Sequence, residues 1–353
     1  MQNPTKGLTE QPKQRTTGES LDSRSQAVIG VDLGGTNTKI GLVDLTGKRL
    51  LEFSRVKTLA DRGPEAVLSN LSASLMVLMD QAKDKGYLVV GVGVGSAGVI
   101  DLNKGVVITS PNLPGWAEFP LGERLRQRLE VPVLVENDVN CICYGEYLFG
   151  AGRELGDFLG IALGTGVGGC LIVDGKVWSG GGSSAGEIGH MTIQPQGEQC
   201  RCGNRGCLET LASASWLVRR AEKLLRRGTT SSLHQHLEGP RGLSAEKIYR
   251  AALAGDQVAQ ELFQAVGASL AIAVANVVHL LGIRRVLIGG GLANAWKVFI
   301  GFLHRELERR LTLMAPPEIR VVKAQLGDNA GALGAAYLVG SRAALEATSD
   351  PGK

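Results

Sequence analysis

Two glycine-rich loops constrain the fold of this chain more than any other feature, because each lies between two short apolar runs of strand character. The first loop reads Asp32-Leu33-Gly34-Gly35-Thr36, and the second, at residues 164–169, reads GTGVGG. A dinucleotide-binding fingerprint needs a helix directly after its glycines, whereas a strand follows here, so both loops are predicted to be hairpin turns. Two such units predict a duplicated α/β fold. The flanking runs are residues 27–33, 38–43, 157–163 and 170–173.

Glycine loops between strands are compatible with phosphate binding. Gly34 and Gly35 let a ligand approach the backbone, and Thr36 adds a hydroxyl donor, so main-chain N–H groups can hold a phosphate there. Taken alone, the same pattern also describes an ordinary turn. A third glycine run, residues 289–291, is suited equally to a flat ligand and to a close crossing of helix and sheet. The chain has no GxxxxGK[ST] motif, which excludes P-loop chemistry.

A cluster of metal-binding side chains lies in the middle of the sequence. His190, Cys200, Cys202 and Cys207 provide one imidazole and three thiols, a set that suits a closed tetrahedral Zn²⁺ site. Thiolates favour zinc over Mg²⁺ or Ca²⁺, and four protein ligands leave no position for water, so the predicted zinc is structural. A disulfide and unliganded surface thiols are the alternatives, and nothing in the sequence indicates an oxidising compartment.

Three acidic residues are candidates for chemistry. Glu187 and Glu209 flank the metal-binding cluster, so a bound metal would also fix both carboxylates. Asp138 follows a strand predicted at residues 131–135, and open α/β sheets place their chemistry at the carboxyl ends of strands. The alternative is that an Asp or Asn here caps the helix predicted at residues 141–148.

Periodicity predicts the remaining elements. Asn112 lies in a rigid loop at residues 110–116, where it is suited either to a polyol ligand or to a satisfied turn. Further strands are predicted at residues 49–53, 87–94, 284–288 and 318–322. Helices are predicted at residues 63–83, 121–129, 209–227, 244–253, 258–281, 293–311 and 328–339.

Composition excludes several classes of protein. The net charge of the 353 residues is +4 and the basic residues are scattered, so no nucleic-acid partner is expected. Residues 1–26 are polar, which excludes a signal peptide and predicts a disordered tail. No apolar run reaches the ~20 residues that span a membrane. We therefore expect a cytoplasmic protein without a membrane partner, in which Cys141, Cys143 and Cys170 are reduced core residues.

These motifs together resemble the ROK family of sugar kinases, over residues 27–342. CRCGNRGCLE at residues 200–209 carries the resemblance most specifically, with DLGGT at 32–36, GTGVGG at 164–169 and GGG at 289–291. The resemblance implies the actin-like, ribonuclease H-like ATPase fold, with two α/β domains around a central cleft. The implied domains are residues 27–137 and 138–327, and the helix at 328–342 is expected to pack back on the first domain.

The resemblance also implies roles for individual residues. Asp138 matches the catalytic base, and Asp32 matches the residue near the Mg²⁺ that accompanies ATP. The sugar-binding positions are matched by Gly98, Asn112, Asn137, Asp138, Glu187, His190 and Glu209. The nucleotide-binding positions are matched by Asp32, Gly34, Gly35, Thr36, Lys39, Gly164, Thr165, Gly166, Gly168, Gly289, Gly290 and Gly291.

The implied reaction is ATP-dependent phosphorylation of a hexose. PNLPGW at residues 111–116 and GEIGH at 186–190 are most similar to the glucokinases of the family, which favours glucose phosphorylated at O6. N-acetylmannosamine and N-acetylglucosamine are alternative substrates, and polyphosphate is an alternative donor. Some family members are transcriptional regulators with a winged-helix domain, but only 26 polar residues precede the first strand here. The resemblance further implies a homodimer or homotetramer.

Overall fold

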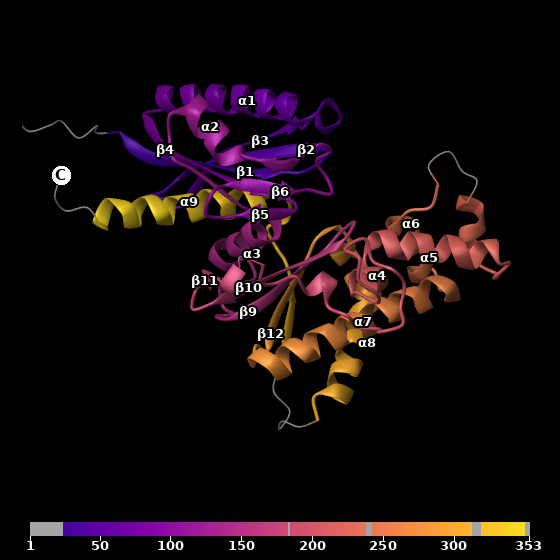
Figure 1. Ribbon diagram of the computed structural model, residues 1–353. Coiled ribbons are helices and arrows are strands. Elements are labelled where there is room, and N and C mark those ends of the chain that lie inside the picture. The colour runs from indigo at the N-terminus through magenta and orange to yellow at the C-terminus, as the bar shows by residue number, and fades with distance from the viewer. Residues whose placement is uncertain (1–23, 183, 238–241, 313–318, 350–353) are drawn as a thin grey trace, which may run out of the picture.

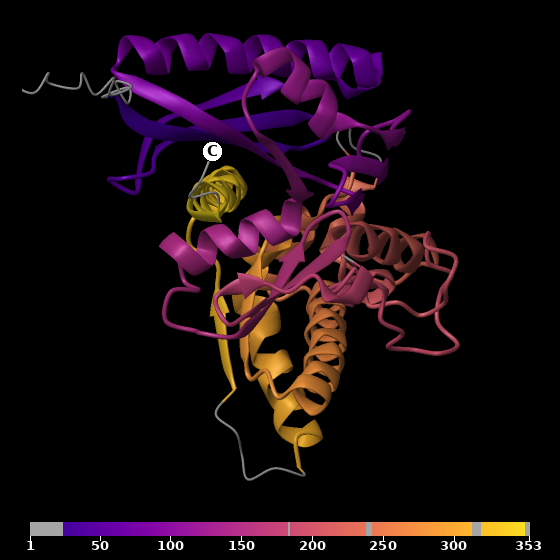
Figure 2. The ribbon, with the colours of Figure 1, turned by 60° about the vertical axis from the view of Figure 1, so that its left-hand side comes forward.

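The computed structural model describes residues 24–182, 184–237, 242–312 and 319–349. Residues 1–23, which make up most of the predicted tail, lie outside this range. Two five-stranded sheets form the centre of two α/β halves (Figures 1 and 2), and we call the sheet near the N-terminus sheet A and the other sheet C. The duplicated α/β fold predicted from the glycine hairpins is confirmed.

Sheet A has the strand order β3-β2-β1-β4-β8. The first three strands form an antiparallel meander, and β4 and β8 run parallel to β1. The strands are β1 (Ser25–Leu33), β2 (Asn37–Asp44), β3 (Arg49–Lys57), β4 (Tyr87–Ser96) and β8 (Val133–Asn137). The predicted boundary of the tail at residue 26 is two residues too late, because Ser25 and Gln26 pair with the start of β4.

Sheet C repeats this topology with the order β11-β10-β9-β12-β13. Here β9, β10 and β11 form the antiparallel meander, and β12 and β13 are parallel to β9. The strands are β9 (Phe158–Leu163), β10 (Val167–Val173), β11 (Lys176–Val177), β12 (Arg285–Gly289) and β13 (Arg320–Lys323). The identical order and directions are what a duplicated unit requires.

Amphipathic helices cover the sheets and bury separate apolar cores. The helices α1 (Pro64–Asp84) and α2 (Leu121–Leu129) pack over sheet A and close its core with side chains such as Leu71 and Leu125. The core of sheet C is closed by helices that include the long α7. These helices are α4 (Glu209–Ala212), α5 (Ala214–Arg226), α6 (Ala245–Leu253), α7 (Gln257–Leu281) and α8 (Trp296–Arg310).

Two helices lie between the sheets, as Figure 2 shows: α9 (Ala330–Ser349) against sheet A and α3 (Asp138–Phe149) against sheet C. Gly30 and Gly93 have no room for a side chain, because the backbone oxygens of Ala332 and Ala335 on α9 lie where a Cβ would be, at 1.8 and 1.9 Å. Backbone therefore packs directly on backbone between α9 and sheet A.

The contact between α3 and α9 is equally close. A Cβ on Gly145 would lie 2.3 Å from the carbonyl oxygen of Ala330, and one on Gly334 would lie 1.8 Å from that of Cys141. Only glycine permits this crossing. The sheets are thus joined through a stack of sheet A, α9, α3 and sheet C, while the chain itself passes between the halves at residues 137–138 and 324–329.

Some predicted elements differ from the structure. A small antiparallel sheet of β5 (Val99–Asp101), β6 (Val106–Thr109) and β7 (Ala117–Phe119) was not predicted. The helix predicted at residues 209–227 is broken at Ser213, whose hydroxyl caps α5 by accepting from the N–H of Trp216. The helix α7 is long and apolar enough to cross a membrane, but 56% of its most apolar window is buried inside the protein, as in the core helix of a soluble protein.

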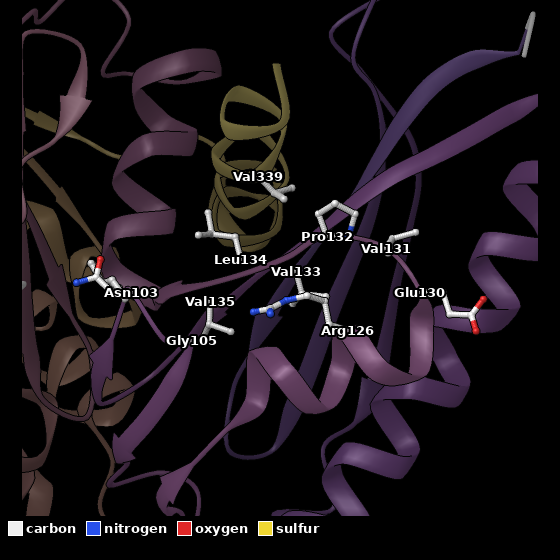
Figure 3. A pocket seen from close by; sticks show the side chains of 11 residues that line it. Asn103, Gly105, Arg126, Glu130, Val131, Pro132, Val133, Leu134, Val135 and Val339 are labelled. Atoms are coloured by element: carbon white, nitrogen blue, oxygen red, sulfur yellow. The ribbon is translucent and has the colours of Figure 1, made fainter. Parts of the chain in front are cut away.

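A cavity of about 500 Å³ opens beside the edge strand of sheet A (Figure 3). It is lined by residues 131–135, which lead into and begin strand β8, by Arg126 and Glu130 at the end of α2, and by Val339 of α9. None of the site residues predicted from the sequence lines this cavity, so the candidate site lies elsewhere.

Candidate functional site

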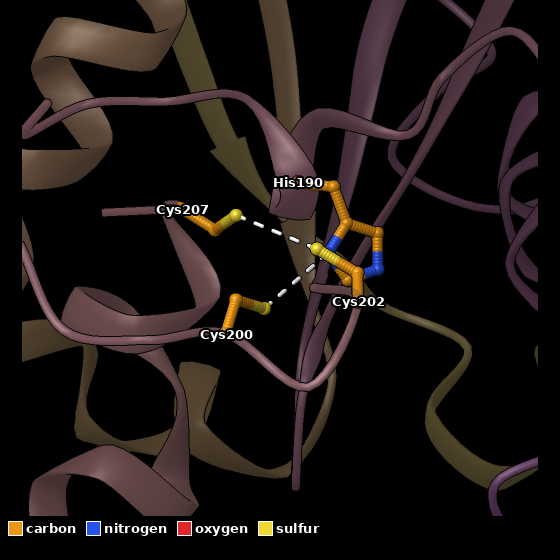
Figure 4. Close-up of side chains that lie close together, drawn as sticks. All are labelled: His190, Cys200, Cys202 and Cys207. Carbon is orange, nitrogen blue, oxygen red and sulfur yellow. Dashed lines mark hydrogen bonds between the residues drawn. The ribbon is translucent and has the colours of Figure 1, made fainter. Parts of the chain in front are cut away.

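The four predicted metal ligands come together in space (Figure 4), with all ligand atoms within 4.8 Å of one another. The Sγ atoms of Cys202 and Cys207 are 3.7 Å apart, and Sγ of Cys200 is 3.7 Å from Nδ1 of His190. In a tetrahedral site with Zn–S bonds of about 2.3 Å, neighbouring sulfurs lie about 3.8 Å apart. The donor set and these two separations therefore fit a tetrahedral zinc site.

The cysteine thiols differ in their ease of ionisation. A backbone hydrogen bond from Asn204 lowers the pKa of Cys202. Burial raises the pKa of Cys207 to about 12, so a cation is needed to hold this residue as a thiolate at neutral pH. Gly203 and Gly206, both at positive φ, form the turn that brings the two cysteines together.

A cavity of about 360 Å³ adjoins this cluster. His190 and Glu187 line it from the second half of the chain, and Gly98 and Asn137 line it from the first half. Because Nδ1 of His190 faces the thiols, its Nε2 is left for other partners. Four of the predicted sugar-binding residues are thus brought to one cavity.

Asn137 holds the junction between β8 and α3. Its Oδ1 accepts from the N–H groups of Val139 and Asn140, at 2.9 and 3.2 Å, and caps the helix. Its Nδ2 donates to the carbonyl of Gly98 at 3.3 Å, which leaves one Nδ2 hydrogen for a ligand. Asn137 is therefore the cap, and the helix begins at Asp138, three residues before the predicted start.

Asp138 lies at the first position of α3, close to two other carboxylates. Burial, followed by repulsion from Asp32, raises the pKa of Asp138 to about 6, and Glu187 adds to the shift. A hydrogen bond from the Val139 N–H acts in the opposite direction. A carboxylate with a pKa near 6 is ionised at neutral pH and is a stronger base than an ordinary aspartate.

The first glycine hairpin, residues 32–36, is fixed from outside by Thr58. The Thr58 hydroxyl donates to the carbonyl of Gly34 at 2.6 Å, and its backbone N–H donates to the carbonyl of Thr36 at 3.1 Å. Thr58 is buried and also contacts the hydroxyl of Thr38 at 2.9 Å. Asn112 lies at this hairpin rather than in the 360 Å³ cavity, because its carbonyl packs against Gly35.

The second glycine hairpin, residues 164–169, is fixed by Glu209. The Glu209 carboxylate accepts from the N–H of Val167 at 2.9 Å and lies where a Cβ on Gly166 would be. It lines a separate cavity of about 330 Å³ beside Thr165, not the one that holds His190. The structure therefore places Glu209 at the hairpin, and both cavities border the cysteine cluster, the first at Cys202 and the second at Cys200.

The third glycine run adjoins the second hairpin. Gly290 has a φ of 86°, and a Cβ there would lie 2.4 Å from the carbonyl of Leu163, the last residue of β9. Neither Gly164 nor Gly291 has a neighbour within 4 Å of its Cβ position, so open space remains beside both runs. The predicted nucleotide-binding glycines of the second half thus share one edge of sheet C.

Lys39 is engaged by two carboxylates. Its Nζ lies 3.1 Å from Asp32 and 3.1 Å from Asp328, which precedes α9. Burial works to lower the pKa of Lys39, but attraction to Asp32 and Asp328 outweighs it and raises the pKa. Arg55 also pairs with Asp328. Lys39 therefore connects the first hairpin to the segment that leads into α9.

Several residues of the site carry no sequence signal. Glu136 and Asn140 line the 360 Å³ cavity and are hydrogen-bonded to each other at 2.9 Å. Their spacing of four residues across a strand end gives no motif. Thr58 holds the first hairpin from 24 residues away along the chain, and only its tertiary contact identifies it.

Comparison with known proteins places this architecture in one family. The profile of the ROK family matches residues 28–342. A glucokinase from Thermotoga maritima is 35% identical over 315 residues, which cover 89% of this chain and 98% of that enzyme. The transcriptional repressor Mlc of Escherichia coli is 30% identical over 300 residues, which cover 85% of this chain and 72% of the repressor.

A solved structure with both substrates' binding sites filled is also similar. It is a ROK family glucokinase from Streptomyces griseus in complex with glucose and AMPPNP, with a TM-score of 0.74 and 33% identity, covering 88% of this chain and 98% of its own. The residues matched by the family profile, 28–342, include both glycine hairpins and the cysteine cluster. With the family profile spanning nearly all of the described residues, the chain belongs to the ROK family.

Proposed function

We propose that this protein is an ATP-dependent sugar kinase that phosphorylates glucose at O6. The observation that carries the proposal is the position of Asp138, a carboxylate with a pKa near 6 at the junction of the two halves. Four of the predicted sugar ligands line a cavity next to it, and the glycine hairpins that can hold phosphates lie on the two sheets. The similarity to glucokinases supports glucose as the substrate.

The reaction proceeds by transfer of the γ-phosphoryl group to a sugar hydroxyl. Asp138 accepts the hydroxyl proton as the sugar oxygen attacks the γ-phosphorus in line, the bond from that phosphorus to the β-phosphate oxygen breaks, and ADP leaves. Phosphoryl transfer needs positioning and charge neutralisation more than covalent help. Main-chain N–H groups of the two hairpins provide both, and closure of the halves excludes water.

Asn137, Glu187 and His190 would orient the sugar in the cavity. Carboxylate, amide and imidazole groups in fixed positions distinguish one arrangement of hydroxyls from another. Glu209 holds the Val167 N–H of the hairpin through Oε2, so it would offer the sugar its other oxygen, Oε1.

The donor sets indicate where metals would bind. His190, Cys200, Cys202 and Cys207 would hold a structural Zn²⁺, which fixes the ring of His190 for its contact with the sugar. Asp32 would face the Mg²⁺ that accompanies ATP, whose charge would help to neutralise the transferred phosphoryl group.

A coupled assay for ADP tests the proposal. The panel should contain glucose, mannose, fructose, N-acetylglucosamine and N-acetylmannosamine, with polyphosphate as a second donor. We expect the highest kcat/KM for glucose with ATP. A preference for an acetamido sugar would overturn the substrate but keep the kinase, whereas no turnover with any pair would contradict the kinase itself.

A further inference from the structure

Glu146 is a fully buried carboxylate that the proposed reaction does not use. It lies in the last turns of α3 with none of its surface exposed. Burial of a charge is costly unless the charge is compensated, and the carboxyl end of a helix disfavours negative charge. In the described part of the chain no lysine or arginine pairs with Glu146. The burial of this carboxylate therefore needs an explanation other than an ion pair.

Three backbone N–H groups compensate this carboxylate. Its Oε1 accepts from Gln325 at 2.8 Å and from Leu326 at 2.7 Å, and its Oε2 accepts from Ala151 at 2.9 Å. Hydrogen bonds to a charged acceptor are about twice as strong as neutral ones. Gln325 and Leu326 belong to the second crossing segment, residues 324–329, through which the chain passes from sheet C to α9.

The other end of the crossing segment is held by the first half. Asp328 pairs with Lys39 of β2 and with Arg55 of β3. Between the two attachments lies Gly327, with a φ of 54° and no neighbour within 4 Å of its Cβ position. The crossing segment is thus attached to α3 before Gly327 and to sheet A after it, with the glycine in open space between the two attachments.

We propose that Glu146 is a positioning residue that anchors the second crossing to α3, so that the halves rotate about Gly327 when the cleft closes. The first crossing enters α3 at Asp138, and Glu146 follows on the same helix. The anchor therefore keeps Asp138 in a constant position relative to sheet C and its glycine hairpin. This inference rests on the proposed function, because closure matters only if both substrates must be enclosed.

Amide hydrogen exchange of the wild-type protein without substrates is the first measurement. The amides of Gln325 and Leu326 lie outside helices and strands, yet we expect exchange at least about tenfold slower than in an unprotected loop, because a buried carboxylate holds them. Exchange at unprotected rates would overturn the anchor. This arm needs no activity, so it remains decisive if no sugar is phosphorylated.

Two substitutions test the function of the anchor. Glu146→Gln keeps the volume but turns an amide NH₂ towards one of the N–H donors, and Gly327→Ala strains the left-handed conformation of the joint. We expect kcat to fall about tenfold in each, with the KM of glucose and ATP changed less than about threefold, because closure rather than binding is impaired. Unchanged kcat in both variants would overturn the proposal.

Matched controls separate positioning from a general loss of stability. Glu154→Gln changes an exposed carboxylate that pairs with Arg320 at the start of β13, at 3.6 Å. Gly282→Ala introduces similar strain at a φ of 71°, also with no neighbour near the Cβ, at the end of α7. Both should keep wild-type kcat. If Glu146→Gln does not fold, Gly327→Ala and the wild-type exchange data still decide the question.

Discussion

The two glycine hairpins have the same strand arrangement, but different side chains hold them. In the first hairpin, a neutral hydroxyl from Thr58, at the end of its own meander, donates to the loop. In the second, a carboxylate from Glu209 accepts from the loop, and Glu209 lies two residues after the metal ligand Cys207. The first loop is therefore fixed from the end of its own sheet, and the second by the helix α4 that follows the cysteine cluster.

This difference shows how a duplicated unit acquires separate tasks. The first hairpin is held by Thr58 from its own half of the molecule, whereas the second is connected through Glu209 to the cysteine cluster and, through His190, to the 360 Å³ cavity. Occupancy of the metal site should therefore affect the second hairpin and leave the first one unchanged.

Asp138, between the two hairpins, should give the largest effect. Asp138→Asn removes the base while keeping the size of the side chain, so kcat should fall by about 10²–10⁴-fold. Glucose affinity, measured by calorimetry, should stay within a few-fold. Activity close to that of the wild type would contradict the assignment of the base.

Cys202→Ala should show the difference between the two hairpins most clearly, because only the second is connected to the metal site. Loss of one of four ligands should abolish stoichiometric zinc and raise the KM for glucose by about tenfold or more, because ordering of His190 depends on the metal. Exchange of amides at residues 164–169 should increase while that at 32–36 stays constant. Cys141→Ala, which removes a buried thiol outside the cluster, should keep its zinc. Full glucose affinity in zinc-free Cys202→Ala would contradict the proposed link between the metal site and the sugar cavity.

The pH dependence tests the environment of Asp138. Since the base must be ionised, kcat/KM should fall about tenfold per pH unit below pH 6.

Stability should change with pH in the opposite direction. The raised folded-state pKa of Asp138 favours the folded protein below pH 3.8, and this contribution is lost as the pH rises through 6. A pKa shift from 3.8 to about 6 corresponds to about 3 kcal/mol of folding free energy, at about 1.36 kcal/mol per unit. The stability of Asp138→Asn minus that of the wild type should therefore be about 3 kcal/mol larger at pH 7 than at pH 3. Denaturant unfolding at both pH values measures this, and an equal difference at both would refute the shift.

The supports of the hairpins should give the smallest effects. Thr58→Val keeps the shape of the side chain but leaves the Gly34 carbonyl without its donor, which should cost about 1–3 kcal/mol of stability. Glu209→Ala leaves the N–H of the buried Val167 without its acceptor, which should cost a similar amount. Each should raise the KM for ATP by a few-fold. If Glu209→Ala instead raises only the KM for glucose, Glu209 acts on the sugar and not on the hairpin.

The sequence predicted the parts of this molecule that depend on local chemistry. The glycine hairpins and the Cys₃His cluster were found from residues close together in the chain, and the structure assembles both. The strands β5 to β7 were missed because each is four residues or shorter and lies among turn residues such as Pro111 and Gly115. Ser213 interrupts a continuous helical pattern that periodicity alone does not resolve.

Residues that act across the fold left no such signal. Thr58, Glu146 and Asn140 are ordinary polar residues in the sequence, and their roles follow only from contacts that tertiary structure creates. The hydrogen bond between the Glu209 carboxylate and the Val167 N–H was also not predicted, because the two residues are 42 positions apart in the chain. The domain boundaries and the oligomeric state remain predictions.

The backbone-on-backbone packing of α9 against sheet A has a consequence for biosynthesis. Sheet A is complete by residue 137, but the helix that covers its inner face begins at Ala330. A ribosome adds about 5–20 residues per second, so this face stays uncovered for roughly ten seconds or more while the second half is made. A nascent chain of this protein therefore presents an apolar sheet surface for most of its synthesis, which is the kind of surface that chaperones recognise.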